Sequence, residues 1–333
     1  MEKYAPINNA CLMILAATAF TAFLVYTKTV LMPFVIALFI FMVANTLSTW
    51  MKQKWKVPYV LGLIACVVAF LGLAALAVVF VSNSIESFVS GADIYTEKLN
   101  DTIEWALATA QKYGANVNAA FITDTLSKIP FFNMVRSVGS GLMSFMTNVM
   151  LVSLFVIFLF MGKASSTDKP TLVGTIQKQI SYYLIIKIFV SLLAALLTWV
   201  VLLAVGSELA GMLAILTFVL NFIPNIGPFI STVLPLPVLF LQYGFDWHII
   251  VALSLLTAVH FTIGNILETK WLGKGMDLDP VVVIACLIFW ALVWGVMGAL
   301  LAVPLTSIIK MVLERSEPTK PLAELLSGRI KFK

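Results

Sequence analysis

The chain has 333 residues, of which 61% are hydrophobic and 11% charged, and its formal net charge is +5. This composition excludes a soluble globular protein and indicates a membrane protein that crosses the bilayer several times. The basic residues are scattered between apolar runs, so they bear on membrane topology and form no patch of the kind that binds nucleic acid.

The first apolar runs lie at 10–27, 30–48 and 59–81, and we interpret residues 1–82 as the first membrane spans. The run at 10–27 is nearly long enough to cross the membrane and lacks the basic start and cleavage site of a signal peptide, so we expect it to be retained. The three cysteines stand alone within apolar runs, which predicts neither a disulfide nor a metal site.

Residues 83–140 differ from the rest because they are polar. Within them, 85–110 has apolar residues at every third or fourth position, which predicts a helix. Acidic residues outnumber basic ones here, and this balance is typical of a segment outside the cytoplasm. We therefore expect a small helical insert on the extracytoplasmic side.

Residues 141–313 form the predicted transport core, with apolar runs at 141–161, 182–205, 209–222, 229–243, 247–267 and 280–309. The runs 209–222 and 229–243 are too short to cross a ~30 Å hydrocarbon layer as single helices. Between them, 221–228 reads Asn-Phe-Ile-Pro-Asn-Ile-Gly-Pro, which breaks a helix. Non-helical backbone inside a membrane is tolerated only against protein or a water-filled cavity, so the break predicts a solute pathway. The alternative is a tight aqueous loop between two short spans.

Lysine and arginine set the expected orientation, because they concentrate on the cytoplasmic side of membrane proteins. They occur in the loops at 52–56, 163–178 and 270–274 and in the tail 314–333. All of these basic segments lie on the cytoplasmic side if both termini are cytoplasmic and the run 280–309 turns back near Gly295–Gly298. Runs 209–243 and 280–309 would then be two opposed re-entrant or short helical hairpins. The alternative is four ordinary short spans with the same parity.

Charged and polar residues within apolar runs are the candidates for function. His260, Gly264 and Glu268 are four residues apart on one helix, with Asn265 beside them, and this polar stripe could bind a cation, a proton or a hydroxylated solute. Alternatively, Glu268 pairs with a lysine of the loop 270–274 at the inner interface.

The predicted substrate or ion pathway comprises the residues of the break and of this stripe: Asn221, Pro224, Asn225, Gly227, His260, Gly264, Asn265 and Glu268. The secondary candidates are Lys187, Asp277, Asp279, Gly295, Gly298 and Pro304. We expect Lys187 to extend to the cytoplasmic headgroups. Asp277 and Asp279 are expected to cap the helix that begins at Pro280. The two glycines and Pro304 are expected to shape the backbone.

The sequence contains no phosphate-binding loop, zinc-ligand spacing or serine nucleophile elbow. We therefore expect no catalytic residues, no cofactor and no bound metal, and the protein is not predicted to be an enzyme.

Several stretches in combination resemble the bacterial autoinducer-2 exporter family. They are the break 221–228, the segment Gly264-Asn265-Ile266-Leu267-Glu268, the turn Leu272-Gly273-Lys274-Gly275 and the segment 295–305. The resemblance extends to Pro33-Phe34 and to Ser181–Lys187, and covers essentially the whole chain. It implies a multi-pass permease of the bacterial inner membrane, with about eight hydrophobic segments, that releases the quorum-sensing signal autoinducer-2. It also implies a homo-oligomer, with a pentamer as one possible form. Other members of the family are assigned as sodium(lithium)/proton antiporters.

The expected function is therefore a permease that exports a small polar solute, autoinducer-2 or a related signalling molecule. One alternative is a sodium(lithium)/proton antiporter that uses Glu268 as the exchanging carboxylate. A second alternative is a membrane scaffold that transports nothing and binds a partner through 83–140. The expected partners are a small-molecule or ion substrate and the lipid bilayer, and no nucleic acid.

Overall fold

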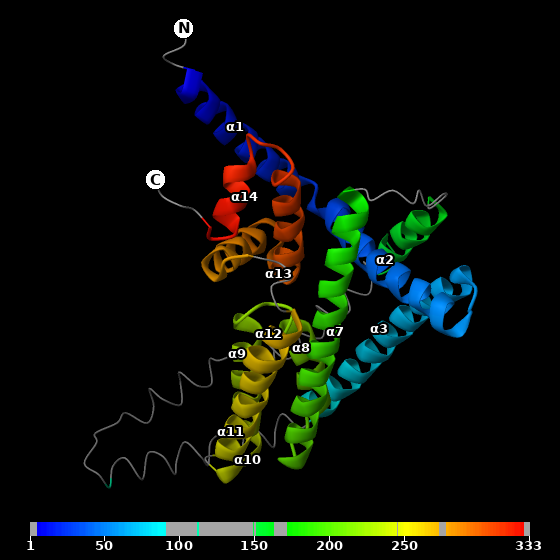
Figure 1. Ribbon diagram of the computed structural model, residues 1–333. Coiled ribbons are helices and arrows are strands. Elements are labelled where there is room, and N and C mark those ends of the chain that lie inside the picture. The colour runs from blue at the N-terminus through cyan, green and yellow to red at the C-terminus, as the bar shows by residue number, and fades with distance from the viewer. Residues whose placement is uncertain are drawn as a thin grey trace. The chain divides into compact units, whose positions relative to one another are not determined.

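Figure 1 shows a computed structural model, which describes residues 5–90, 112, 149, 151–162, 172–244, 246–272 and 278–329. Most of these residues are helical, and no strand occurs among them, as the composition predicted. Most of the insert predicted for 83–140 lies outside the described residues, as does Asp277. Helix α3 (Tyr59–Ser90) continues into the beginning of that insert.

Six helices in the described part of the chain are long and apolar enough to cross a membrane. They are Lys28–Trp55, Tyr59–Glu86, Val173–Ala204, Ile226–Tyr243, Trp247–Trp271 and Pro280–Leu313. Shorter apolar helices occupy Leu15–Tyr26, Leu151–Met161 and Ala210–Leu220. The prediction of an all-α membrane protein with many apolar segments is confirmed.

The chain divides into two compact units. The first comprises Met1–Leu63, Asn148–Leu184 and Lys274–Lys333, and the second comprises Ile64–Thr147 and Ile185–Gly273. Helices α3 and α7 (Leu172–Ala204) each belong to both units, because the divisions fall within them.

The first unit contains α1 (Ala5–Tyr26), α2 (Lys28–Trp55), α13 (Pro280–Leu313) and α14 (Lys320–Leu326). Helix α1 packs against both α2 and α13. The indole Nε1 of Trp294 donates to the Leu24 carbonyl oxygen at 3.0 Å, which ties α13 to the end of α1. Ser181 donates to the Met42 carbonyl oxygen at 3.0 Å and joins α7 to α2.

Helix α13 reverses direction at Gly295, and Figure 1 shows its two arms in orange. Gly295 has φ 66° and ψ −147°, a conformation open to glycine and strained for other residues. Trp290 Nε1 donates to Thr306 Oγ1 at 3.2 Å, although 16 residues of straight helix would separate them by about 24 Å. The predicted reversal near Gly295–Gly298 is confirmed.

The start of α13 is joined to the end of α14. Asp279 Oδ1 accepts from the Val281 backbone N–H at 2.8 Å and caps α13, as predicted. The Asp279 backbone N–H donates to the Leu326 carbonyl oxygen at 3.1 Å. Helix α14, which follows α13 after a short link, therefore packs back against α13.

The second unit contains a second hairpin, formed by α8 (Ala210–Leu220), α9 (Ile226–Val233) and α10 (Pro235–Tyr243). Helix α8 has 11 residues, about 16 Å of rise, and is therefore too short to cross the membrane. Helix α8 packs along α9 after the break. The Tyr243 hydroxyl donates to the Gly206 carbonyl oxygen at 2.9 Å, so the two ends of this hairpin lie close together.

After α10 the chain continues as α11 (Trp247–Phe261), the π-helix η2 (Thr262–Glu268) and α12 (Thr269–Leu272). Helix α11 packs against α9 and α10. The core of the second unit is apolar and includes buried side chains from α7, α8, α10 and α11, among them Leu202, Leu213, Leu239 and Leu256. This packing holds α7 next to the broken hairpin.

Candidate functional site

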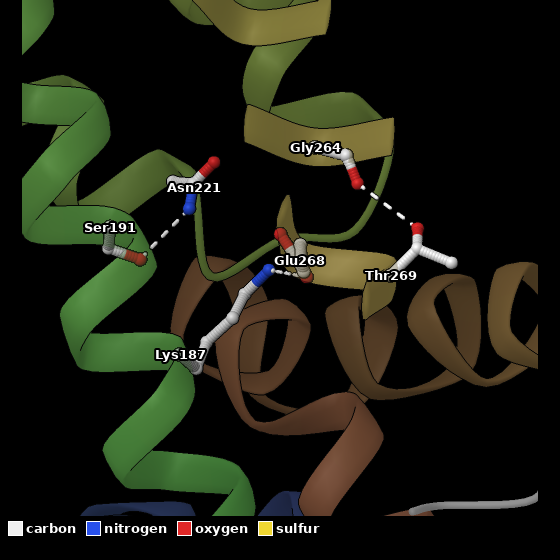
Figure 2. Close-up of polar contacts among 6 residues, drawn as sticks. All are labelled: Lys187, Ser191, Asn221, Gly264, Glu268 and Thr269. Atoms are coloured by element: carbon white, nitrogen blue, oxygen red, sulfur yellow. Dashed lines mark hydrogen bonds and ion pairs between the residues drawn. The ribbon is translucent and has the colours of Figure 1, made fainter. Parts of the chain in front are cut away.

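The centre of the candidate site is an ion pair inside the second unit. The Lys187 ammonium on α7 pairs with Glu268 Oε1 at the end of η2 (Figure 2). The Lys187 side chain is 1% exposed and that of Glu268 is 16% exposed. The prediction that Lys187 extends to the headgroups is therefore wrong. Among the described residues the partner of Glu268 is Lys187, and Lys274, one of the two lysines considered as its alternative partner, lies outside them.

The π-helix explains how Glu268 comes to face α7. A π-helix closes its hydrogen bonds over five residues rather than four, so its turn is wider than that of an α-helix. One α-turn followed by one π-turn therefore brings residues eight apart onto the same face, and His260 and Glu268 both contact α7. Thr269 Oγ1 donates to the Gly264 carbonyl oxygen at 3.4 Å, within the widened segment.

Apolar side chains surround the ion pair. Val190, Ala194 and Ile263 form a buried cluster between α7 and η2. The rings of Phe189 and Trp271 lie 5.5 Å apart at the same interface. An ion pair in such surroundings is weakly screened, and removing one partner leaves an uncompensated buried charge at a cost of about 3–5 kcal/mol.

The helix break brings a second polar contact to α7. Asn221 follows the last residue of α8, and its Nδ2 donates to Ser191 Oγ at 3.0 Å (Figure 2). Asn221 is 1% exposed, and its Oδ1 has no hydrogen-bond partner among the described residues. A buried acceptor without a partner is costly, so this atom is available to a ligand or a water molecule.

The other residues of the break shape its backbone. Asn225 has φ 60°, and the Ile226 N–H donates to the Pro224 carbonyl oxygen at 2.6 Å, which closes a tight turn before α9. A Cβ atom on Gly227 would overlap the Leu220 carbonyl, so glycine lets the two arms of the hairpin meet. Pro224, Asn225 and Gly227 therefore act through the backbone, which positions Asn221.

A third polar contact lies further along α7. Thr198 Oγ1 and His260 Nε2 are 3.5 Å apart, and both residues are buried. His260 Nδ1 lacks a hydrogen-bond partner in the described part of the chain.

Lys187, Ser191 and Thr198 share one face of α7, because they are separated by four and seven residues. Figure 2 shows the first two of these side chains projecting toward Glu268 and Asn221.

The predicted stripe on 260–268 is only partly present. Asn265 is exposed, and its Nδ2 donates to the Phe261 carbonyl oxygen of its own helix at 3.3 Å. Gly264 contributes its carbonyl oxygen, which accepts a hydrogen bond from Thr269 Oγ1.

Asp279, Gly295, Gly298 and Pro304 belong to the first unit, whereas the Lys187–Glu268 pair belongs to the second. Asp279 is a helix cap, and a Cβ atom on Gly298 would overlap the Trp290 carbonyl, so this glycine permits the α13 hairpin to close. Pro304 is buried within the second arm of α13.

Ser191 and Thr198 were missed by sequence reasoning. Hydroxyl side chains are common in membrane helices and usually bond to their own backbone, so neither residue stood out. Their spacing from Lys187 on one helix face was the signal that could have identified them. No group of three potential metal ligands occurs among the described residues.

Comparisons with known proteins find a family and relatives that match most of the chain. Residues 12–317 match the family described as AI-2E family transporter. The AI-2 transport protein TqsA of Escherichia coli (strain K12) is 27% identical over 313 residues, covering 91% of this chain and 90% of its own length. The putative transport protein YhhT of the same organism is 29% identical over 314 residues, covering 91% and 89%. A putative transport protein of Borreliella burgdorferi is 34% identical over 167 residues, covering 50% and 46%.

Proposed function

The chain belongs to the AI-2E transporter family, and from this premise we propose that it exports a small polar solute, autoinducer-2 or a related signalling molecule. It is a multi-pass membrane transport protein. The observation that carries the proposal is the set of buried polar contacts on α7, where a broken helix places Asn221 Oδ1 with no hydrogen-bond partner among the residues that the structure describes.

Buried polar groups in a membrane helix bundle are costly and usually serve a substrate or ion pathway. Discontinuous helices provide such sites in transporters, because the break frees polar groups at the depth of the membrane interior. Asn221 at the end of α8 fits this description. The family and the name of the relative TqsA support autoinducer-2 as the substrate.

The competing function is sodium(lithium)/proton exchange, with Glu268 as the exchanging carboxylate. Glu268 supports it as a carboxylate within an apolar span. The pairing with Lys187 counts against it, because the carboxylate already has a cationic partner.

We place the protein in the bacterial inner membrane with both termini in the cytoplasm, and the basic loops and tail support this orientation. One span, Trp247–Trp271, lies between the two hairpins in the chain, so they would enter the membrane from opposite sides. The proposed homo-oligomer rests on the family resemblance alone.

The test is efflux of labelled autoinducer-2 from vesicles that contain the purified protein, with sodium and lithium flux measured in parallel with and without a pH gradient. We expect autoinducer-2 efflux that Asn221→Ala lowers at least about tenfold, since a buried hydrogen bond to the solute is lost. The matched control is Ser254→Ala, which removes an exposed hydroxyl that bonds to the backbone of α11. Cation exchange without efflux of the solute would establish the competing function.

A further inference from the structure

We propose that Lys187 determines the specificity of this site: its ammonium occupies the cation position of Glu268, so the site accepts an uncharged, hydroxyl-bearing solute and rejects free monovalent cations. This inference rests on the proposed function and concerns the same site. Its basis is the ion pair together with the acceptor atom of Asn221 (Figure 2).

Within α7 to α10 and η2, the described charged residues near the site are Lys187 and Glu268 themselves. Helices α8, α9 and α10 contain no charged residue. On α7 the charged residues are Lys178 and Lys187, and Lys178 is exposed. Glu268 is the charged residue of η2, so the described residues offer Lys187 no second carboxylate within these elements.

A sodium or lithium ion would either displace Lys187 from the carboxylate or bind beside it, and binding beside it would leave a net positive charge buried in the site. The displaced ammonium would remain buried, since the side chain is 1% exposed. An unpaired charge in such a position is strongly unfavourable, and the ion would also lose its own hydration. The tethered ammonium therefore outcompetes a free cation for Glu268.

A hydroxylated solute meets no such barrier. An ionised carboxylate has about four lone-pair positions, and the ammonium occupies one side of the group. Glu268 is 16% exposed and so keeps an accessible side. A hydroxyl group can donate to it while the ion pair stays intact.

Asn221 selects for the same chemistry. Its Nδ2 donates to Ser191 Oγ, and its buried Oδ1 has no hydrogen-bond partner among the described residues, so Oδ1 is the atom that remains to accept from a ligand. This acceptor requires a hydrogen-bond donor, and it carries no formal charge with which to compensate a cation. Together, Asn221 and Glu268 present acceptors to a solute that brings hydroxyl donors and no charge.

The experiment compares Lys187→Met with the wild-type protein in vesicles. Methionine has a similar length and no charge, so it frees the carboxylate. We expect the wild-type protein to transport autoinducer-2 with no sodium or lithium flux above that of empty vesicles. Lys187→Met should raise that cation flux at least about tenfold, because the competing ammonium is gone. Lys178→Met, on the exposed side of the same helix, should leave the cation flux at background.

An unchanged cation flux in Lys187→Met, with the variant folded, would overturn the proposal. A direct binding measurement on the wild-type protein covers the case in which this variant fails to fold. The melting temperature of the purified wild-type protein should not rise with sodium or lithium relative to choline. A rise that Glu268→Gln abolishes would show that cations reach the carboxylate despite Lys187, and would overturn the proposal. Absence of autoinducer-2 efflux would instead contradict the proposed function, since the cation measurements do not depend on it.

Discussion

Lys187 and Glu268 lie 81 positions apart in the chain, yet each neutralises the charge of the other inside an apolar interface. Their interaction differs from a surface ion pair, which contributes at most about 1 kcal/mol and is screened by salt. Here the penalty for an unpaired charge dominates, so the two residues should tolerate joint replacement better than single replacement.

We predict this non-additivity for the stability of the protein in detergent. Glu268→Gln and Lys187→Met should each lower the free energy of unfolding by about 3–5 kcal/mol, because each leaves one buried charge without its partner. The double variant should recover most of that loss, since neither charge remains. Thermal unfolding of all four proteins completes the double-mutant cycle. Additive losses would mean that the two side chains are stabilised independently.

The sequence identified Glu268 and Asn221 as candidates because charges and amides are rare in apolar runs. It could not identify their partners. Lys187 lies near the start of an apolar run, a position in which lysine usually reaches the headgroups. Helical periodicity specifies the face of a helix, whereas the partner across that face depends on packing between distant segments.

At the scale of elements, two hairpins define the architecture, and each depends on a glycine that lets two backbones meet. Gly227 lies against the Leu220 carbonyl in the α8–α9 hairpin, and Gly298 lies against the Trp290 carbonyl in α13. Neither position has room for a side chain.

We predict that Gly227→Ala lowers both stability and solute efflux. The added methyl group would push α8 away from α9, and such overpacking costs about 1–3 kcal/mol. It should also shift Asn221 relative to Ser191. The control is Gly72→Ala in α3, where a Cβ atom meets no atom within 4 Å. Thermal unfolding and vesicle efflux measure the two effects, and equal behaviour of both variants would refute the close approach.

Both hairpin reversals were predictable, because proline, glycine and asparagine interrupt the apolar runs at 221–228 and glycine does so at Gly295. The π-helix, in contrast, could not be predicted from the sequence. Its widened turn has no local sequence signature, and the residues Thr262–Glu268 would also form an ordinary α-helix. Interpreting Thr262–Glu268 as an ordinary α-helix predicted a polar stripe that included Asn265. The structure places Asn265 on the exposed side.

At the scale of the whole molecule, orientation in the membrane follows from the distribution of basic residues. A cysteine at Asn100, within 83–140, is predicted to react with an impermeant thiol reagent added to intact spheroplasts. A cysteine at Lys54, in the basic last turn of α2, should react only after permeabilisation. Cys11, Cys66 and Cys286 must first be replaced, because they are free thiols. The opposite labelling pattern would invert the topology.

The shortness of α8 has a consequence for the biogenesis of the protein. The translocon recognises spans through a window of about 19 apolar residues, and the 11 residues of α8 do not fill it. We therefore expect the nascent chain to remain in the translocon until α9 and α10 have left the ribosome, so that residues 210–243 enter the bilayer together. The Tyr243–Gly206 hydrogen bond would then join the two ends of the inserted segment.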